Sequence, residues 1–532
     1  MILPFRAVVY LVFFSSRVAY IAGVLQLKFS ASPAPNTPLV ATASTQGALR
    51  ELAYRLTYRL PILLSAPISS GKTLIITHAA AQLYPDSSTQ VVRVHLADTS
   101  IDARSLLGSH AASPTKPGTF EWREGAIVRA MKEGKWLVLE DIDKASGEVL
   151  ATLWPLVESL TLEKHIGGHA QLQVYGRGLV RAKEGFALFA TRSVAASIDG
   201  HVPPITFLGA HKWYPINIKI PTVIELRDII RTRFARLPPA LLPPILDVWF
   251  KLQRLANSSA AARHLGTRDL MKWCMRIESL KVPSMMDLDE SSNLPFVEVI
   301  PNSSIREEVF IEGHDVFFGA MSESPAAQAL MTTMASTLAA ALGFGDDKLK
   351  FLLADRVPEW EVVKGPDGKI RTVHIGRISL PAVVTRGLLQ TNPRRPFALH
   401  KPSLQLLARL ATCVALNEPI LLTGETGTGK TTAVSHLASL LSRHLLSLNL
   451  SQQTESSDLL GGFKPVDARI PAAELQRRFQ EIFAATFSRE KNLKFEEAVR
   501  SAVSVGKWKR AVALWKECVK RAKDRIQGKQ EG

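Results

Sequence analysis

Two short stretches of this chain have the form of a phosphate-binding loop set between a strand and a helix. The better formed reads LLTGETGTGKTT and contains the loop Gly424–Thr431. The earlier one reads LLSAPISSGKTL, and its lysine, Lys72, precedes Lys430 by 358 residues. A loop of this kind needs a parallel sheet behind it, because an apolar strand enters the loop and a helix leaves it. The chain must therefore accommodate two α/β domains.

The similarity of the two stretches extends beyond their loops. Each loop is preceded by a short apolar strand and followed by an apolar-periodic helix, a second apolar strand and a polar turn that ends in Leu-Leu-Gly. The second strand reads VVRVHL in the first copy and HLLSLNL in the second. We interpret this as a tandem duplication of an α/β nucleotide-binding module. A chain of 532 residues has room for roughly two to four domains.

The second loop, GETGTGKT, contains every group that phosphate binding requires. Its glycines let backbone N–H groups turn towards phosphate oxygens, its lysine reaches the β- and γ-phosphates, and its threonine hydroxyl holds Mg²⁺. We assign Thr431 as a magnesium ligand. Nucleotide binding is assigned to the whole loop, namely Gly424, Glu425, Thr426, Gly427, Thr428, Gly429, Lys430 and Thr431.

The first loop departs from this pattern. Alanine stands where the first glycine is expected, and Pro67 removes one backbone donor. Because alanine disfavours positive φ, we expect altered loop geometry, with nucleotide binding retained and hydrolysis weakened. The binding residues here are Ala66, Gly71, Lys72 and Thr73, with Thr73 as the magnesium ligand.

A pair of carboxylates ends the apolar strand in KWLVLEDIDKA. Glu140 and Asp141 follow Trp136–Leu139. Such a pair normally has aspartate first, in the Mg²⁺ shell, and glutamate second, polarising the attacking water. Here the order is reversed, so Glu140 can still reach the metal shell while Asp141 is one methylene short for the base role. The alternative is that both are surface acids at a strand end.

Four segments together resemble the midasin family of dynein-related AAA+ ATPases. They read WREGAIVRAMKEGKWLVLEDIDKA, TRDLMKWCMRI, GETGTGKT and LNLSQQTESSDLLGGFKPVD. The resemblance covers roughly residues 46–532 and implies several AAA+ modules in one chain, with ATP and Mg²⁺ as cofactors. It implies a nuclear protein, in nucleolus and nucleoplasm, that acts on pre-60S ribosomal particles and their assembly factors. The other AAA+ modules of the same chain would be its further partners.

The resemblance also assigns roles to residues outside the loops. The strand FALFATRS ends at Ser193, where such ATPases place a polar sensor of the γ-phosphate. Arg268, at the start of the helical segment TRDLMKWCMRI, corresponds to a lid arginine that reaches the γ-phosphate; the alternative is an arginine on a solvated helix face. Where an arginine finger is expected, FLGAHKWYPINIKIP has no arginine and offers His211 and Lys212 instead, and lysine lacks the guanidinium fork.

The expected architecture is a P-loop AAA+ fold with a parallel sheet core, a helical lid and a partial second module. We expect an atypical N-terminal segment at 1–45, the first α/β core at 46–235, its lid at 236–355 and a connector at 356–400. Residues 401–532 would be an incomplete second core with a helical insertion. No apolar strand ending in paired acids follows Lys430, so we expect the sequence to stop inside this module. Lid helices are predicted at 244–256, starting at Pro244, 267–280 and 326–342.

Composition limits the partners of the chain. A formal charge of +17 and an isoelectric point near 9.8 suit acidic partners, but no basic motif interleaved with aromatic residues predicts sequence-specific nucleic-acid binding. The three cysteines are far apart, which argues against a disulfide scaffold or zinc site. The apolar run at residues 7–14 follows Arg6 and is cut off by Arg17. It has the form of a short signal or anchor, a mis-set start, or a buried element; we expect no membrane partner.

Three functions remain open from the sequence. The main hypothesis is an ATP-binding and ATP-hydrolysing AAA+ remodeller that removes assembly factors during maturation and nuclear export of pre-60S particles. The second is a nucleotide-binding scaffold module that does not hydrolyse ATP. The third is an AAA+ motor of the MoxR or chelatase kind with a substrate unrelated to ribosomes.

Overall fold

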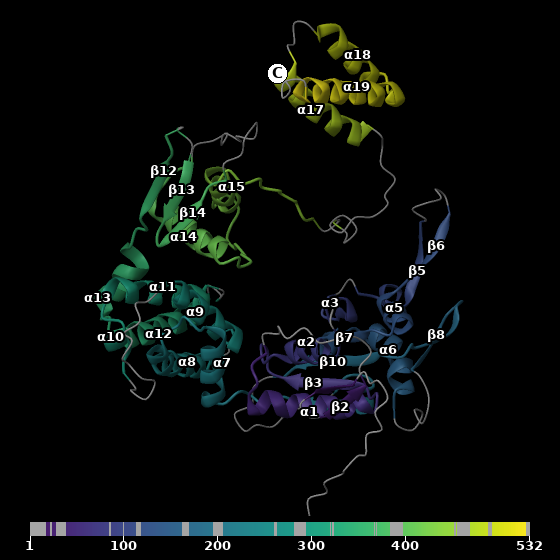
Figure 1. Cartoon of the computed structure of the whole chain (residues 1–532). Coiled ribbons are helices and arrows are strands. Elements are labelled where there is room, and N and C mark those ends of the chain that lie inside the picture. Colours follow the sequence, from purple (N-terminus) through teal and green to yellow (C-terminus); the bar gives the residue numbers. More distant parts are fainter. Residues whose placement is uncertain are drawn as a thin grey trace, which may run out of the picture. The chain divides into compact units, whose positions relative to one another are not determined.

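The computed structural model of the chain is shown in Figure 1. It describes residues 18–21, 24–27, 39–84, 87–98, 101–112, 119–161, 170–194, 206–259, 263–280, 294–319, 321, 324–366, 368, 370–383, 397–451, 454, 469–487 and 492–527. The chain divides into two compact units. One comprises residues 1–111 and 121–447, and the other comprises 112–120 and 448–532.

The first core is a five-stranded parallel sheet with the strand order β11-β3-β10-β7-β4. The predicted parallel α/β sheet is therefore confirmed. Strand β10 lies between β3 and β7, so the carboxyl ends of three strands that are distant in sequence meet at one edge of the sheet. The strands are β3 Ile62–Ala66, β4 Val91–His95, β7 Trp136–Glu140, β10 Ala187–Ser193 and β11 Tyr214–Asn217.

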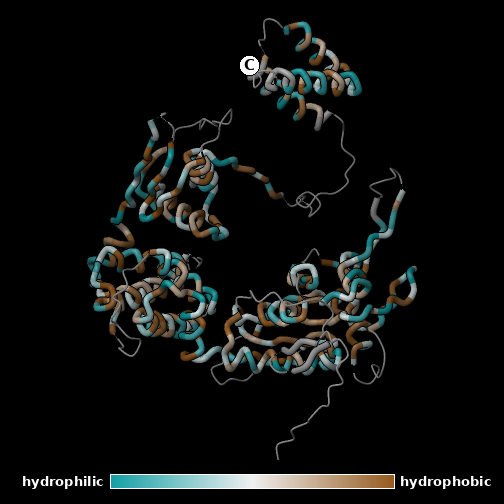
Figure 2. The backbone as a smooth tube through the Cα atoms, in the orientation of Figure 1, coloured by the Kyte–Doolittle hydropathy of each residue, from teal (hydrophilic) through white to brown (hydrophobic). Residues whose placement is uncertain are grey.

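Both faces of this sheet are covered, which explains why its strands are continuous hydrophobic runs. All five residues of β3 are buried. Ile62 and Leu64 belong to one hydrophobic cluster and Leu63 to another, as the alternation of side chains along a strand requires. Figure 2 shows hydrophobic stretches along the strands of this sheet.

Helices from different parts of the sequence supply the two coverings. Helices α1 and α2 contribute to the cluster that contains Ile62, and α5 and α6 to the cluster that contains Leu63. The longer helices are α1 Ala43–Thr57, α2 Lys72–Leu83, α5 Ala126–Glu133 and α6 Gly147–Ser159. The shorter ones are α3 Ser87–Gln90, α4 Ala103–Leu107, η1 Ile142–Lys144 and η2 Ala210–Lys212. Three two-stranded sheets complete this region: β1 Val18–Ile21 with β2 Val24–Leu27, β5 Gly108–Ala112 with β6 Phe120–Glu124, and β8 Gln171–Val174 with β9 Gly178–Arg181.

A helical lid follows the first core in sequence. The predicted helices at 244–256, 267–280 and 326–342 correspond to α8, α9 and α12. The predicted start of α8 is wrong by two residues: the helix begins at Leu242 and carries Pro243 and Pro244 in its first turn, where no N–H bond is needed. The lid elements are α7 Val223–Arg233, η3 Pro239–Leu241, α8 Leu242–Asn257, α9 Thr267–Ser279, α10 Phe296–Val299, α11 Ser303–Phe318, α12 Pro325–Ala341, α13 Asp346–Lys350 and the π-helix η4 Phe351–Asp355.

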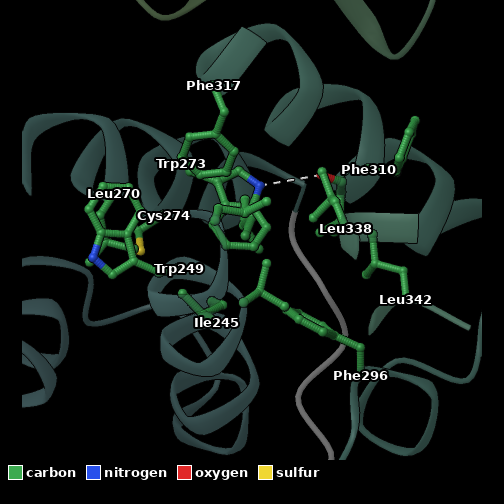
Figure 3. Close-up of a cluster of buried hydrophobic side chains, with 14 of the residues drawn as sticks. Ile245, Trp249, Leu270, Trp273, Cys274, Phe296, Phe310, Phe317, Leu338 and Leu342 are labelled. Carbon is green, nitrogen blue, oxygen red and sulfur yellow. Dashed lines mark hydrogen bonds between the residues drawn. The ribbon is translucent and has the colours of Figure 1, made fainter. Parts of the chain in front are cut away.

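Large aromatic side chains fill the core of the lid (Figure 3). Trp249, Trp273, Phe310 and Phe317 are all almost completely buried. The indole nitrogen of Trp273 donates a hydrogen bond to the carbonyl of Val309 at 3.3 Å, so its one polar group is satisfied. Full burial of each side chain of this size contributes about 1.5–3 kcal/mol to stability, which makes α9 a firmly held element of the lid.

The segment predicted as a connector is a folded antiparallel sheet with the strand order β12-β13-β14. It packs against α14 and α15 through residues such as Val373, Leu407 and Leu437. Helix α15 leaves the second phosphate-binding loop, so the connector and the helix that follows this loop share one hydrophobic core. The elements are β12 Trp360–Lys364, β13 Ile370–Ile375, β14 Ile378–Pro381, α14 Lys401–Ala415 and α15 Lys430–Leu440.

In the described residues of the second unit the structure has three helices, α17 Arg469–Thr486, α18 Leu493–Ser504 and α19 Trp508–Gln527. Phe479, Phe483, Val499 and Cys518 form their shared core. The helical region expected late in the chain is therefore present. Most of the SQQTESSDLLGG turn that precedes it, residues 452–453 and 455–462, lies outside the described residues, as does the apolar run at 7–14.

Among the described residues, no single helix is long and apolar enough to cross a membrane. One bent pair, Pro325–Ala341 with Asp346–Asp355, passes by length and composition together, with a bend of 120° between its halves. The three cysteines are free thiols.

Candidate nucleotide-binding sites

The first loop connects β3 to α2 and has the conformation of a phosphate cradle. Gly71 has a φ of 84° and Ser69 a φ of 66°, both in the left-handed region. The ammonium group of Lys72 folds back over the loop and donates to the carbonyls of Ala66 and Pro67, each at 3.0 Å. Helix α2 starts at Lys72, so its N-terminal N–H groups and positive dipole end face the loop.

Ala66 causes less disturbance than the sequence predicts. It is the last residue of β3 and pairs with Ser193 of β10, and it is not among the residues with positive φ. The non-glycine residue that carries the strain in this loop is Ser69, at the position that Gly427 occupies in the second loop. A serine in the left-handed region costs on the order of 1 kcal/mol. Ser69 was not among the site residues predicted from the sequence.

The strand order brings two predicted site residues onto Lys72. Its ammonium nitrogen lies 3.3 Å from the Ser193 hydroxyl, which in turn donates to a carboxylate oxygen of Asp141 at 3.3 Å. The backbone N–H of Asp141 donates to the Thr191 hydroxyl at 3.2 Å, and Asp141 has a φ of 54°. Burial lowers the pKa of Lys72, although the charges of Asp141, Asp143 and Glu140 oppose the shift.

Glu140 faces a different neighbour. Its carboxylate lies 3.3 Å from Nδ1 of His95, at the end of the adjacent strand β4. Asp141 therefore takes part in the hydrogen-bond chain that contains Lys72, while Glu140 is paired beside it. His95 was missed from the sequence, because only the pairing of β4 with β7 places it next to Glu140.

Helix α9 of the lid reaches the first loop at its first residue. The hydroxyl of Thr267 donates to the carbonyl of Ser69. Gly266 is packed so closely that an added Cβ would lie 3.0 Å from the Ser69 Cβ and 3.3 Å from the carbonyl oxygen of Ile68. Arg268, the predicted lid arginine, is the next residue and is exposed. The structure thus places the start of α9 at the loop, with Thr267 as the contacting residue.

The region of the expected arginine finger forms the short helix η2. His211 packs its ring against Trp154 with a centroid separation of 5.5 Å, and Lys212 follows it as the last residue of η2. Neither side chain supplies a guanidinium fork.

The second loop repeats the lysine geometry of the first. Lys430 donates to the carbonyls of Gly424 and Glu425 at 2.8 and 2.6 Å and lies 3.4 Å from the Thr428 hydroxyl. All three loop glycines have positive φ: 147° at Gly424, 87° at Gly427 and 83° at Gly429. Thr426 lies in the turn of the loop and Thr431 in the first turn of α15.

The two strands predicted around the second loop are absent. The structure describes residues 419–422 and 446–450, and it assigns no strand to either segment. Their apolar side chains are exposed instead: Leu421 is 87% and Leu446 75% exposed. A strand needs a hydrogen-bonding partner along its edge, and neither segment has one in the described structure. The prediction of these strands was wrong for that reason.

Magnesium would be held by hard oxygen ligands, and the first site offers them. Thr73 follows Lys72 directly in α2, and the carboxylate of Asp141 belongs to the same hydrogen-bond chain as Lys72. Hydroxyl and carboxylate oxygens suit Mg²⁺. Within the described residues there is no cluster of three or more His, Cys, Asp or Glu side chains that could hold a metal without a nucleotide.

Comparisons with known proteins agree with this geometry. A family model described as an AAA domain of the dynein-related subfamily matches residues 62–191 and again 419–501, and one described as the midasin AAA lid domain matches residues 225–341. Midasin of Dictyostelium discoideum is 28% identical over 92% of this chain, and midasin of Giardia intestinalis is 25% identical over 82%. The chain is therefore similar to midasins over most of its length, and it contains a region that matches the midasin AAA lid domain.

The chain spans only 9% of the length of the Dictyostelium midasin and 8% of the Giardia midasin. Protein NorQ of Paracoccus denitrificans is 31% identical, over 19% of this chain and 34% of its own length. Among solved structures, NtrX of Brucella abortus has 16% sequence identity and a TM-score of 0.30, covering 58% of this chain and 68% of that one. The midasin relatives therefore match far more of this chain than NorQ does.

Proposed function

We propose that this chain binds ATP at both loops and works as part of an AAA+ machine that remodels precursors of the large ribosomal subunit in the nucleus. The machine would use ATP to remove assembly factors from these pre-60S particles before their export. The curated relatives named midasin and the midasin-type lid support this proposal. Ribosomal particles, nuclear location and a chaperone-like role come from the family resemblance.

One observation carries the nucleotide-binding part. Lys72 at the start of α2, Ser193 at the end of β10 and Asp141 just after β7 form one hydrogen-bond chain at the edge of a parallel sheet. This edge is where open α/β sheets bind ligands. The helix N-terminus and the Lys72 ammonium supply positive charge for phosphate groups, while Asp141 and Ser193 supply a carboxylate and a hydroxyl.

Each side chain of the first site then has a defined task. Lys72 exchanges its two loop carbonyls for phosphate oxygens, because charge-assisted bonds are stronger than bonds to neutral acceptors. Thr73 and the Glu140–Asp141 pair would hold Mg²⁺, which when bound neutralises phosphate charge. Ser193, at the end of β10, lies beside Lys72 and would hydrogen-bond to the γ-phosphate, so that β10 responds to its presence. Thr267 holds the lid on the loop.

A second function, a nucleotide-binding module that hydrolyses ATP poorly, is favoured by specific features of the first site. Pro67 removes one backbone N–H donor from the loop. Nδ1 of His95 lies 3.3 Å from the Glu140 carboxylate. His211 and Lys212 stand where an arginine finger is expected. The third possibility, a motor with a non-ribosomal substrate, is supported by short matches such as the one to NorQ.

Nucleotide titration tests the proposal. The purified 532-residue chain is titrated with a fluorescent ATP analogue and Mg²⁺, and phosphate release is measured in parallel. We expect saturable binding that is reduced by Lys72→Ala and by Lys430→Ala, with slow phosphate release. Absence of saturable binding would overturn the assignment of both loops.

The ribosomal part needs a separate measurement. Antibodies against this chain are used to follow the native protein through a sucrose gradient of nuclear extract. We expect co-sedimentation with precursor RNA of the large subunit, in fractions that shift when ATP is depleted. Sedimentation apart from all ribosomal precursors would favour the motor with another substrate.

A further inference from the structure

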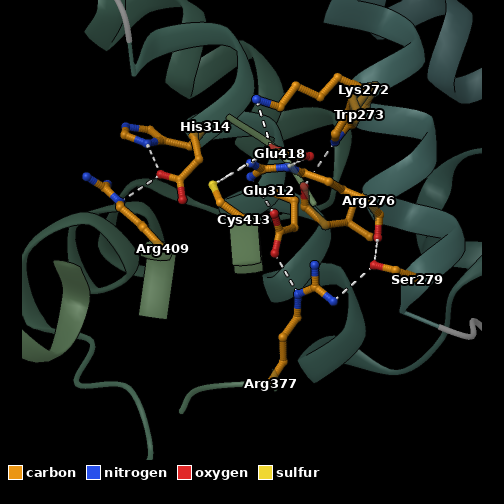
Figure 4. Close-up of polar contacts among 12 residues, drawn as sticks. Lys272, Trp273, Arg276, Ser279, Glu312, His314, Arg377, Arg409, Cys413 and Glu418 are labelled. Carbon is orange, nitrogen blue, oxygen red and sulfur yellow. Dashed lines mark hydrogen bonds and ion pairs between the residues drawn. The ribbon is translucent and has the colours of Figure 1, made fainter. Parts of the chain in front are cut away.

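A buried ionic cluster joins the lid to the segment that leads into the second loop (Figure 4). Its centre is Arg276 of α9, which donates from Nε and Nη2 to both carboxylate oxygens of Glu418, at 3.0 and 2.6 Å. Its third nitrogen, Nη1, donates to Glu312 of α11 at 2.8 Å. Lys272 adds a second cation to Glu418 at 2.9 Å, and Arg377 adds one to Glu312 at 2.6 Å. We call these five residues the Arg276 cluster.

The cluster is shielded from water. The side chains of Arg276 and Glu312 are each 4% exposed and that of Glu418 is 6% exposed. Burial alone would raise the pKa of Glu418, but the hydrogen bonds from Arg276 and Lys272 lower it. Burial alone would lower the pKa of Arg276, but the hydrogen bond with Glu418 and the charge of Glu312 raise it. The shifts at Arg276 and Glu418 both favour the charged forms, whereas burial raises the pKa of Glu312 in spite of the charges of Arg377 and Arg276.

Stability alone does not account for this cluster. Apolar residues of similar volume often replace a buried ion pair at no loss, whereas a charged network fixes one arrangement of its elements. Arg276 uses a bidentate fork, which specifies both distance and angle to Glu418. The cluster thus fixes the position of the Glu418 backbone relative to α9.

Glu418 lies at a sensitive position in the sequence. It precedes Gly424, the first residue of the second loop, by six residues. Its backbone N–H donates to the carbonyl of Cys413 at 2.8 Å, and Asn417 before it has a left-handed φ of 53°. Backbone and side chain are thus both anchored where the chain turns from α14 towards the second loop.

The opposite end of the same helix contacts the first loop. Thr267, the first residue of α9, donates to the Ser69 carbonyl, and Gly266 is packed against Ser69. Arg276 lies nine residues later, about 14 Å along the helix at 1.5 Å per residue. Leu270, Trp273, Cys274 and Ile277, all fully buried, hold the helix in the lid core. One rigid helix therefore touches the first loop at one end and the support of the second loop near the other.

We propose that Thr267 and Arg276 are positioning residues that couple the two nucleotide sites through α9. Nucleotide at the first loop displaces Lys72 from the loop carbonyls and changes the conformation of the loop around Ser69. Thr267 carries that change into α9, and the Arg276–Glu418 fork carries it to the second loop. By thermodynamic reciprocity, nucleotide at the second loop then alters affinity at the first. The inference rests on the proposed binding of nucleotide at both loops.

Hydrogen exchange measured peptide by peptide tests the coupling, because it reports each loop separately. ADP is titrated into the 532-residue chain, and the midpoint of protection is followed in peptides covering residues 66–73 and 424–431. In the chain with Lys72→Ala, which empties the first site, we expect the midpoint for 424–431 to move by about fivefold or more.

Variants of the cluster separate coupling from folding. In the Glu418→Gln chain, adding Lys72→Ala should move the ADP midpoint for peptide 424–431 by less than twofold, because the bidentate contact between Arg276 and Glu418 is broken. Thr267→Val, at the far end of α9, should give the same loss of coupling without touching the buried charges. Lys251→Ala, which removes an exposed ion pair with Asp247 on α8, is the matched control and should keep the full shift. A merely structural role would alter the midpoints themselves but not their dependence on the first site.

The possible outcomes separate the proposed nucleotide binding from the proposed coupling. If neither peptide becomes protected by ADP, the proposed nucleotide binding fails and the coupling with it. If both become protected but Lys72→Ala leaves the second midpoint unchanged, the sites bind independently and only the coupling is overturned. Circular dichroism shows whether Glu418→Gln still folds. If it does not, the test rests on Thr267→Val: if Lys72→Ala still moves the 424–431 midpoint about fivefold in that variant, the proposal is overturned.

Discussion

At the scale of single residues, the two loop lysines behave alike despite different surroundings. Lys72 and Lys430 each donate to the carbonyls six and five positions before them. Lys72 is buried, and its pKa is lowered by that burial, whereas the bonds of Lys430 lie in an exposed loop. The local loop sequence therefore sets the lysine conformation, and the sheet determines which other groups meet it.

The first prediction concerns Lys72→Ala in a Lys430→Ala background, where only the first site can bind. Losing one charge-assisted contact to phosphate costs about 1.5–3 kcal/mol, so affinity for a fluorescent ATP analogue should fall roughly 10–150-fold. Lys251→Ala in the same background should bind normally. Equal affinity with and without Lys72 would show that this loop is not a nucleotide site.

The second prediction concerns Glu225, which joins the start of α1 to the start of α7. Its carboxylate accepts from the N–H and hydroxyl of Ser44, each at 2.7 Å, and from the N–H of Thr222 at 2.9 Å. Although burial opposes the shift, these bonds lower the pKa of Glu225 to about 2. Because the folded-state value lies below the unfolded one, the stabilisation is complete above about pH 4.5 and is lost as pH falls towards 2.

Urea unfolding at pH 6 and pH 3 measures this effect. Glu225→Gln should reduce the free energy of unfolding by about 1–2 kcal/mol at pH 6. The difference between the two chains should be smaller at pH 3 and should vanish only as pH approaches 2, where the carboxylate becomes protonated in the folded chain as well. A difference that stays constant across this range would show that the carboxylate charge contributes nothing.

At the scale of elements, the contact between α9 and the first loop depends on Gly266. A methyl group there would meet the Ser69 Cβ at 3.0 Å and its hydroxyl at 3.1 Å. We predict that Gly266→Ala pushes the start of α9 off the loop and weakens nucleotide binding at the first site several-fold, with a folding cost of about 1–3 kcal/mol.

Gly47→Ala is the matched control for this variant. Gly47 lies inside α1, and an added Cβ meets nothing within 4 Å. The change should therefore stabilise the protein by about 0.5–1 kcal/mol and leave nucleotide affinity unchanged. Both effects are read from thermal unfolding with and without nucleotide. Normal affinity in Gly266→Ala would mean that α9 does not support the loop.

At the scale of the whole molecule, two loops predict two nucleotides per chain. Isothermal titration of the 532-residue chain should give a stoichiometry near two, and each single lysine variant a stoichiometry near one. The double variant should bind none. A stoichiometry of one in the unaltered chain, abolished by Lys72→Ala, would show that the second loop needs strands beyond those formed here to bind.

The linear sequence determined the parts of this protein that local chemistry specifies. The loops, their lysines, the hydrophobic runs of the first sheet and the amphipathic helices α8, α9 and α12 all follow from residue type and spacing, because glycine conformation and apolar periodicity act over a few residues. The midasin-type lid was expected because the TRDLMKWCMRI segment resembles the midasin family, and residues 225–341 match the midasin AAA lid domain.

Tertiary structure alone decided which of these parts meet. Ser193 and Asp141 reach Lys72 because β10 pairs between β3 and β7, and strand order is a property of the sheet. Thr267 and Glu418 became candidates because α9 contacts the first loop at one end and Glu418, six residues before the second loop, near the other. The apolar segments around Gly424 failed to become strands because a strand exists only when another backbone supplies its hydrogen-bond partners. Propensity is local, whereas pairing, burial and charge partnership depend on which elements fold against one another.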